Sequence, residues 1–162
     1  MSNKIKVGFG YDVHALVTGR PLVLGGVSIP YSKGLSGWSD ADVLLHAVMD
    51  ALLGAAALGD IGTHFPPGKP EFKNISSLTL LSKVKELLDN NHWKTGNIDV
   101  MVLAEEPKLK DYKEYMIQNI ANTLGVPTGC ISVKAGTSEK IGFIGRGEGI
   151  AVQAVALIEL NQ

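Results

Sequence analysis

The chain has 162 residues, of which 45% are hydrophobic and 19% are charged. This length suits a single domain over residues 1–162, and the composition is that of a folded globular protein rather than a disordered one. The formal net charge of −1 excludes a general electrostatic attraction to nucleic acid or to an anionic membrane surface. Neither a signal peptide nor a bilayer-spanning apolar run is visible, and the lone Cys130 excludes a disulfide framework, so we expect a cytoplasmic protein.

The first third of the chain predicts a strand, a hairpin and a helix. Apolar and polar residues alternate over residues 4–14, which indicates a strand. Short apolar runs at 21–24 and 27–29, joined by Gly-Gly, are typical of a β-hairpin. Ser39 is a plausible N-cap for a helix that ends near Gly59. Periodicity then predicts a loop at 59–74, helices at 76–90 and 110–124, and strands at 98–104, 131–135 and 149–160.

The last strand indicates how the layers pack. One of its faces is wholly apolar, and the other is half apolar. The wholly apolar face of such a strand packs against a layer of helices, and its second, partly apolar face favours association of subunits. We therefore predict an α/β (α+β) fold, in which a mixed four-stranded sheet carries helices on one face and is joined by the N-terminal β-hairpin.

Three side chains indicate a metal site. Asp12 and His14 share one face of the first strand, and His46 from the following helix would complete a three-ligand set that leaves a zinc ion one open position. Asp42 and Asp50, one helical turn on either side of His46, are suited to hold its second ring N–H. The residues alone leave open that His14 caps a turn and that His46 is an ordinary helix histidine.

Two later segments indicate phosphate or nucleotide binding. Residues 134–149 combine small hydroxyls and glycines with Lys140 and Arg146, and Glu139 adds an oxygen ligand suited to Mg²⁺. Residues 104–110 leave a strand end, where α/β sheets bind ligands. A glycine-rich connection and an ordinary charged loop are the alternative interpretations of these two segments.

Five segments in this order resemble one family, the 2-C-methyl-D-erythritol 2,4-cyclodiphosphate synthases of non-mevalonate isoprenoid biosynthesis. They are Gly-Tyr-Asp-Val-His at 10–14, Gly-Gly-Val-Ser-Ile-Pro-Tyr at 25–31, Ser-Asp-Ala-Asp-Val at 39–43 with His46, Asp-Ala-Leu-Leu-Gly-Ala-Ala-Ala-Leu-Gly-Asp-Ile-Gly at 50–62, and Thr-Ser-Glu-Lys-Ile-Gly-Phe-Ile-Gly-Arg-Gly-Glu-Gly-Ile at 137–150.

The resemblance implies a metal-dependent phosphorus–oxygen lyase. Its substrate would be 4-diphosphocytidyl-2-C-methyl-D-erythritol 2-phosphate, which cyclises to the 2,4-cyclodiphosphate and releases CMP. It also implies a homotrimer whose sheets face a central channel, with active sites between subunits and with room for an isoprenoid diphosphate in the channel. The cofactors would be one Zn²⁺ per site and Mg²⁺ or Mn²⁺ with the substrate diphosphate. A bacterial cytosol fits the lack of a transit peptide.

The resemblance also assigns residues by position. Asp12, His14 and His46 match the zinc ligands, Glu139 matches a ligand of the second ion, and Thr137 lies beside the transferred group. The predicted substrate-binding residues are Ser39, Asp60, Ile61, Gly62 and Phe65 on the erythritol-phosphate side, Ala104, Pro107, Lys108, Leu109, Lys110, Gly136 and Ser138 on the cytidine diphosphate side, and Phe143 and Arg146 at the channel.

Two positions depart from the family pattern. Trp38 stands where a histidine associated with transition-state stabilisation is usual, and its indole N–H is a possible partial substitute. Pro67 stands where an acidic residue is common. Two other functions are weighed beside the cyclase: a zinc-dependent hydrolase acting on a nucleotide diphosphate, and a trimeric sensor of small molecules or isoprenoid diphosphates.

Overall fold

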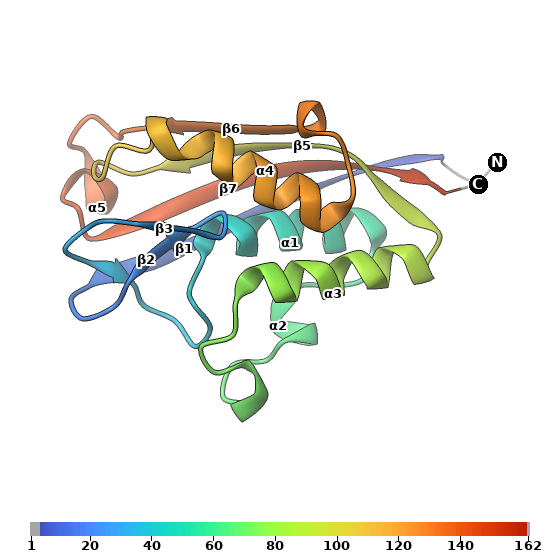
Figure 1. The fold of residues 1–162 in the computed structure, drawn as a ribbon, viewed down its shortest axis with the longest axis horizontal. Coiled ribbons are helices and arrows are strands. Elements are labelled where there is room, and N and C mark those ends of the chain that lie inside the picture. The colour runs from blue at the N-terminus through green and yellow to red at the C-terminus, as the bar shows by residue number, and fades with distance from the viewer. Residues whose placement is uncertain (1–3, 162) are drawn as a thin grey trace.

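The computed structural model describes residues 4–161 (Figure 1). Residues 1–3, in which the sequence shows no signal peptide, lie outside the described part. The strands are β1 (Ile5–Val17), β2 (Leu22–Leu24), β3 (Val27–Ile29), β4 (Gly34–Leu35), β5 (Trp93–Leu103), β6 (Ile131–Gly136) and β7 (Gly149–Leu160). The helices are α1 (Val43–Ala56), α2 (Ile61–His64), α3 (Ser77–Asn90), α4 (Lys113–Leu124) and α5 (Gly142–Gly145), with 3-10 turns at Pro70–Phe72, Lys110–Tyr112 and Thr128–Cys130.

The main sheet has five strands in the order β4-β1-β7-β5-β6. Only β5 and β6 pair in parallel, and the other neighbours are antiparallel, so the sheet is mixed as predicted. The hairpin of β2 and β3 is also confirmed and forms a separate sheet. The prediction of four strands is wrong. It misses β4, which pairs only Leu35 and Gly34 with the end of β1 and is too short to show any alternation.

The helices cover one face of the main sheet, with α1 and α3 below it in Figure 1. Helix α1 lies directly on β1 because two glycines of that strand, Gly8 and Gly10, leave no side chain between them. A Cβ atom at Gly10 would come within 1.9 Å of the Ala47 carbonyl oxygen. The even-numbered residues of β1, which include Asp12 and His14, therefore face α1 across a very short gap.

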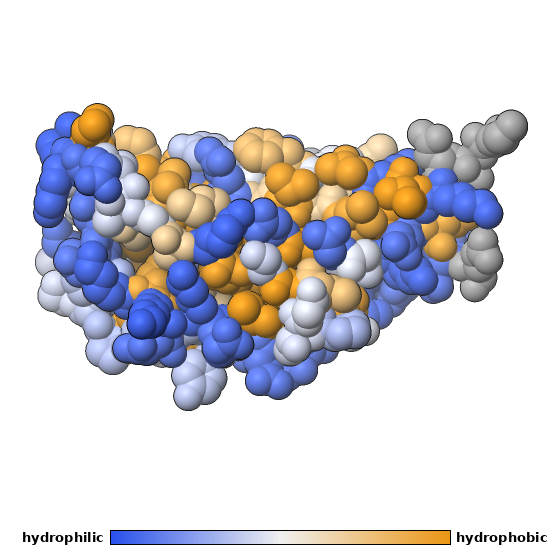
Figure 2. All heavy atoms as spheres, turned by 90° about the horizontal axis from the view of Figure 1, so that it is seen from above, coloured by the Kyte–Doolittle hydropathy of each residue, from blue (hydrophilic) through white to orange (hydrophobic). Residues whose placement is uncertain are grey.

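The opposite face of the sheet is open and apolar. On β1 the odd-numbered residues are exposed hydrophobics, with 41% to 64% of their surface accessible (Ile5, Val7, Phe9, Tyr11 and Val13). Val155 of β7 is exposed on the same face. Figure 2 looks onto this side of the molecule and shows hydrophobic side chains, in orange, along its middle. An uncovered apolar face of this extent is typical of a surface that binds another protein chain.

Several boundaries differ from those predicted, each for a local reason. The side chain that caps α1 belongs to Asp42 rather than Ser39, because Asp42 accepts the Leu45 N–H. Strand β5 starts at Trp93 instead of 98, since a bulge at Gly96 interrupts its alternation. No helix within residues 4–161 has the length and apolar character needed to cross a bilayer.

Candidate active site

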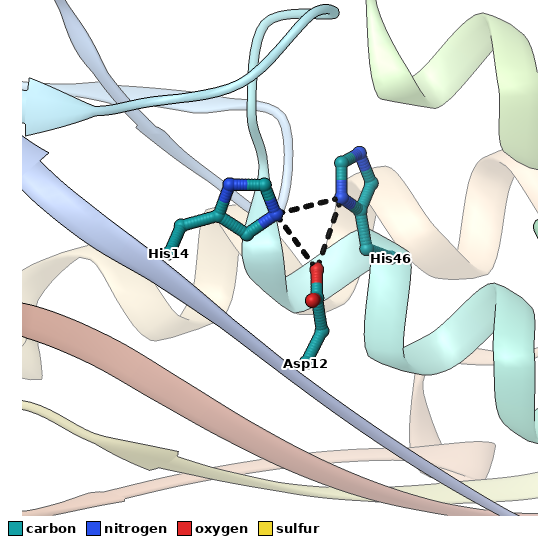
Figure 3. A group of neighbouring side chains, drawn as sticks. All are labelled: Asp12, His14 and His46. Carbon is teal, nitrogen blue, oxygen red and sulfur yellow. Dashed lines mark hydrogen bonds and ion pairs between the residues drawn. The ribbon is translucent and has the colours of Figure 1, made fainter. Parts of the chain in front are cut away.

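The structure brings Asp12, His14 and His46 together where β1 meets α1 (Figure 3). The Asp12 Oδ2 atom lies 2.9 Å from His14 Nε2 and 3.1 Å from His46 Nδ1, and the two ring nitrogens are 3.3 Å apart. These are the only residues in the described chain that form such a group, with one ligand atom each and all three atoms within 4.8 Å of one another. Two imidazoles and a carboxylate are a donor set that fits a three-ligand metal site.

Asp12 and His14 stabilise each other's charged forms. Burial by itself would raise the pKa of Asp12, but hydrogen bonds from His14 and His46 and their positive charge hold it well below its usual range. Burial likewise opposes protonation of His14, yet its hydrogen bond to Asp12 raises the His14 pKa above 6.5. The other ring nitrogen of His14, Nδ1, donates to the Ser36 carbonyl, which turns Nε2 toward Asp12. Asp12 is therefore an ionised acceptor with both rings aimed at it.

The prediction that Asp42 or Asp50 holds the second nitrogen of His46 is wrong. Asp42 is fully buried and accepts the backbone N–H groups of Gly25, Gly26 and Leu45. Burial raises its pKa to about 6 against these hydrogen bonds. Asp50 instead accepts the Ile61 N–H. The nitrogen that they were expected to hold, His46 Nε2, lies 3.2 Å from both Ser39 Oγ and Ser77 Oγ.

A cleft of about 210 Å³ opens beside the three ligands. Of the predicted erythritol-side residues, Ser39, Ile61, Gly62 and Phe65 line it, together with Trp38 and Pro67. Asp60 does not line it, because its carboxylate caps α2 through Thr63. Ile61, Phe65 and Phe72 form apolar walls, whereas the Asp12 group and Ser39 supply the polar part of the lining.

Trp38 closes one side of this cleft by holding the segment that follows α2. Its indole N–H donates to the Lys69 carbonyl at 2.9 Å, and the Lys73 ammonium lies 5.9 Å from the ring centroid. The Trp38 carbonyl also accepts the Asn74 N–H. Because the indole N–H already has an acceptor, the structure gives Trp38 contacts that fix a loop, and it gives the predicted indole–phosphate hydrogen bond no free donor.

A second cleft, of about 180 Å³, lies at the ends of β5 and β6. The predicted nucleotide-side residues that line it are Ala104, Pro107, Lys108, Leu109, Lys110 and Gly136, and Thr137, predicted beside the transferred group, lines it too. Glu105, which lies within the predicted segment 104–110 but was not singled out as a site residue, also lines it. Its carboxylate accepts the N–H groups of Ser138 and Lys140, and these hydrogen bonds lower the Glu105 pKa. The signal was a carboxylate at the strand end, but its partners lie about thirty residues further along the chain.

The remaining predicted residues lie around the turn that Glu105 holds. Ser138 donates its N–H to Glu105 and its hydroxyl to the Ile141 carbonyl at 2.8 Å, and Glu139 and Lys140 have positive φ angles of 53° and 65°. Glu139 is exposed, lies beside Thr137 and is not part of the Asp12 group. Phe143 and Arg146 lie on or just after α5, where Arg146 pairs with Glu148 at 2.7 Å.

The two clefts lie at the same end of the main sheet but share no lining residue among those described. The register aligns Asp12 of β1 with Val152 of β7, and Val152 with Val102 of β5, only two residues before Ala104. Strand β7 lies between the strands that lead to the two clefts. The described chain thus has two separate clefts at one end of the sheet: one beside the Asp12 group, called the metal-type cleft below, and one at the ends of β5 and β6, called the nucleotide-type cleft after the ligand predicted there.

Comparison with known proteins assigns this arrangement to a family. Residues 5–159 match the model of the YgbB family. A 2-C-methyl-D-erythritol 2,4-cyclodiphosphate synthase from Dehalococcoides mccartyi is 55% identical over 96% of this chain and 99% of its own. The bifunctional IspDF structure from Campylobacter jejuni is 46% identical with a TM-score of 0.93, over 96% of this chain, which spans 42% of that longer one. The IspF structure from Plasmodium falciparum in complex with CDP is 33% identical with a TM-score of 0.87, over all of both chains. The chain belongs to the YgbB family, that of the 2-C-methyl-D-erythritol 2,4-cyclodiphosphate synthases.

Proposed function

We propose that this chain, as a single domain, converts 4-diphosphocytidyl-2-C-methyl-D-erythritol 2-phosphate into 2-C-methyl-D-erythritol 2,4-cyclodiphosphate and CMP, a lyase reaction of non-mevalonate isoprenoid biosynthesis. The observation that carries the proposal is the Asp12–His14–His46 group at the mouth of a cleft, with a nucleotide-type cleft at the same end of the sheet. Family membership supports it, as does the 55% sequence identity to a known synthase over nearly the full length of both chains. The CDP complex of a relative supports a cytidine nucleotide as ligand, and the bacterial relatives fit a cytoplasmic enzyme.

The metal at the Asp12 group is Zn²⁺ in this proposal, because one carboxylate and two imidazoles match its preferred ligands. Glu139, an exposed carboxylate next to Thr137, is the ligand for a second ion, Mg²⁺ or Mn²⁺, which hard oxygen donors favour. When bound, the two ions would act as Lewis acids that stabilise the negative charge of the pyrophosphate.

The chemistry is an internal phosphoryl transfer. An oxygen of the 2-phosphate bonds to the β-phosphorus, the bond from that phosphorus to the CMP oxygen breaks, and CMP leaves with the electron pair. A phosphate nucleophile is already ionised near neutral pH, so the chain needs no general base. Its residues mainly position the substrate. Thr137 donates a hydrogen bond to the developing charge, Ser39 orients the phosphate, and the apolar wall of Ile61 and Phe65 keeps water from the β-phosphorus.

A homotrimer completes the site in this proposal. The open apolar face of the sheet, with Phe9 at 61% exposure, would be covered by two further copies of the chain around a channel. The metal-type cleft of one subunit would then meet the nucleotide-type cleft of its neighbour. Phe143 and Arg146 would face the channel, where an isoprenoid diphosphate could bind.

Phosphorus NMR of the purified protein with substrate, Zn²⁺ and Mg²⁺ tests the activity. We expect the 2,4-cyclodiphosphate and CMP in equal amounts, and no solvent ¹⁸O in either product. Incorporation of solvent oxygen would indicate a hydrolase, and ligand binding without CMP release would indicate a sensor. The variant His46→Ala should fold but lose bound zinc, and equal zinc content in variant and parent would refute the ligand assignment.

Sedimentation equilibrium tests the assembly. Phe9→Asp places a charge on the open sheet face and should shift the protein from trimer to monomer. Tyr115→Asp is the matched control, because Tyr115 is an aromatic residue with similar exposure, 64%, on the outer surface of α4. Unchanged mass for Phe9→Asp, or equal loss of trimer in the control, would contradict the proposed interface.

A further inference from the structure

The outer nitrogen of His46 lies between two serine hydroxyls that differ in where their protons go. His46 Nδ1 belongs to the ligand group, while Nε2 is 3.2 Å from Ser77 Oγ and 3.2 Å from Ser39 Oγ. Ser77 is the first residue of α3 and is completely buried, and His46 itself is 8% exposed. A metal ion on Nδ1 takes the place of the proton that Asp12 would otherwise accept there, and the one proton left on the ring must then be on Nε2, where these serines are its neighbours.

The proton of Ser77 is committed to Asp40. Ser77 Oγ donates to Asp40 Oδ1 at 2.5 Å, a length typical of a hydroxyl bound to a carboxylate, and the Ser77 N–H donates to Asp40 Oδ2 at 2.9 Å. The Asp42 N–H also donates to Asp40. An ionised carboxylate can only accept. Ser77 Oγ therefore has only lone pairs to offer His46, and it is satisfied only when Nε2 carries the ring proton.

Ser39 makes no such demand. Its Oγ accepts the Ala41 N–H at 3.2 Å, and among the described hydrogen bonds its own proton has no acceptor other than His46 Nε2. Ser39 can thus donate to an unprotonated Nε2 or turn its proton elsewhere when Nε2 is protonated. It is compatible with either form of the ring, whereas Ser77 is compatible with one.

We infer that Asp40 and Ser77 are positioning residues that accept the Nε2 proton of His46 and so hold the ring with Nδ1 turned toward the metal ion. The inference rests on the proposed function, since it concerns the metal at that site. A histidine ligand whose outer N–H is held by a fixed acceptor keeps its orientation and is a better donor, and loss of such a partner typically lowers metal affinity by about 10- to 100-fold.

The tautomer can be read directly in the unsubstituted protein. Long-range ¹⁵N–¹H correlation spectra of the full chain, stripped of metal with a chelator, report which nitrogen of each histidine carries the proton. We expect a proton on His46 Nε2 before any metal is added, either in the Nε2–H tautomer or in the doubly protonated ring that the ionised Asp12 beside Nδ1 favours. A ring protonated at Nδ1 alone would overturn the inference, and this measurement requires no variant to fold.

Zinc affinity, measured by competition with a chromophoric chelator, gives the second test. Ser77→Ala should bind zinc about 10- to 100-fold more weakly, and Ser77→Thr, which keeps the hydroxyl, should recover most of the loss. Ser76→Ala is the matched control, because Ser76 is the exposed N-cap of the same helix and has no hydrogen bond to His46 or Asp40 among those described. Parental affinity in Ser77→Ala, or an equal loss in Ser76→Ala, would overturn the inference. Failure of the unsubstituted protein to bind zinc would instead count against the proposed function.

Discussion

Replacing Gly10 by alanine would place a methyl group between β1 and α1, the two elements that supply the candidate metal ligands. The added Cβ atom would lie 1.9 Å from the Ala47 carbonyl oxygen and 2.8 Å from the Ala51 nitrogen. Ordinary van der Waals contact begins at 3.4 Å, so the Cβ atom and the Ala47 oxygen would be about 1.5 Å too close. Both neighbours are backbone atoms of α1, and neither can rotate away. The helix or the strand has to move as a whole.

That movement acts on the metal site more than on the fold. Overpacking of a core typically costs about 1–3 kcal/mol, which corresponds to a Tm lower by roughly 2–12 °C in a chain of this size. His46 is the residue next to Ala47, whereas Asp12 and His14 lie on the strand. A separation of about 1 Å exceeds the roughly 0.2 Å tolerance of a metal–ligand distance. We therefore expect Gly10→Ala to fold but to lose zinc affinity by more than about 100-fold.

Gly54→Ala is the matched control in the same helix. Its added Cβ atom would meet nothing closer than the Phe9 carbonyl oxygen at 4.0 Å, so alanine should raise the stability by about 0.5–1 kcal/mol and leave zinc binding unchanged. Calorimetry gives the two Tm values, and chelator competition gives the two affinities. Parental zinc affinity in Gly10→Ala would show that the close approach of α1 to β1 does not set the ligand geometry.

Four further predictions concern the site and its loops. Because the hydrogen bond to Asp12 raises the pKa of His14 above 6.5 against the effect of burial, its stabilisation of the metal-free protein is present below pH 6.5 and is lost as the pH rises through that raised value. Zinc must displace this proton, so its apparent affinity should increase over the same range, with proton release visible in calorimetry; a flat profile would contradict the coupling. Trp38→Phe removes the hydrogen bond to the Lys69 carbonyl and should speed amide hydrogen exchange in residues 69–74 about fivefold. Unchanged exchange would show that this hydrogen bond does not hold the loop. Trp38→His should raise the rate of CMP release if an imidazole donor is what that position lacks. Glu105→Ala removes the acceptor that holds the turn at residues 138–140 and should weaken CDP binding by more than about tenfold while zinc content is retained. Calorimetric titration with CDP measures this affinity, and an unchanged value would contradict the role of Glu105.

The sequence predicted the ligand group because each ligand lies on an element with a strong periodic signal. Alternation placed Asp12 and His14 on one strand face, and the helical pattern supplied His46. The partner of His46 was not predictable in the same way. Helical spacing puts Asp42 one turn away, but that carboxylate is already engaged as the cap of α1, and a cap has a local energetic preference that spacing does not show. The groups that lie against this nitrogen are the hydroxyls of Ser39 and Ser77, and Ser77 is 31 residues beyond His46.

The same distinction explains the errors in the fold. The long strands and helices were found because apolar residues repeat along them. Strand β4 was missed because two residues have no period, and α2 and α5 because four residues make barely one helical turn. The close packing of α1 on β1 requires glycine at positions 8 and 10. Glycine in a strand is also typical of a β-bulge, so the sequence alone does not distinguish close packing from a bulge.

Residues 38–42 show how an irregular segment can make a metal site precise. Its polar side chains connect three parts of the fold: Ser39 contacts His46 of α1, Asp40 holds the start of α3, and Asp42 joins the β2–β3 turn to the start of α1. Ala41, with a φ of 59°, gives the backbone the reversal that separates these directions. A ligand on a helix is only as well placed as the residues that fix the helix start and the ring behind it. Since these contacts converge on the first turn of α1, where His46 lies, the segment fixes the ligand from several sides without itself touching the ion.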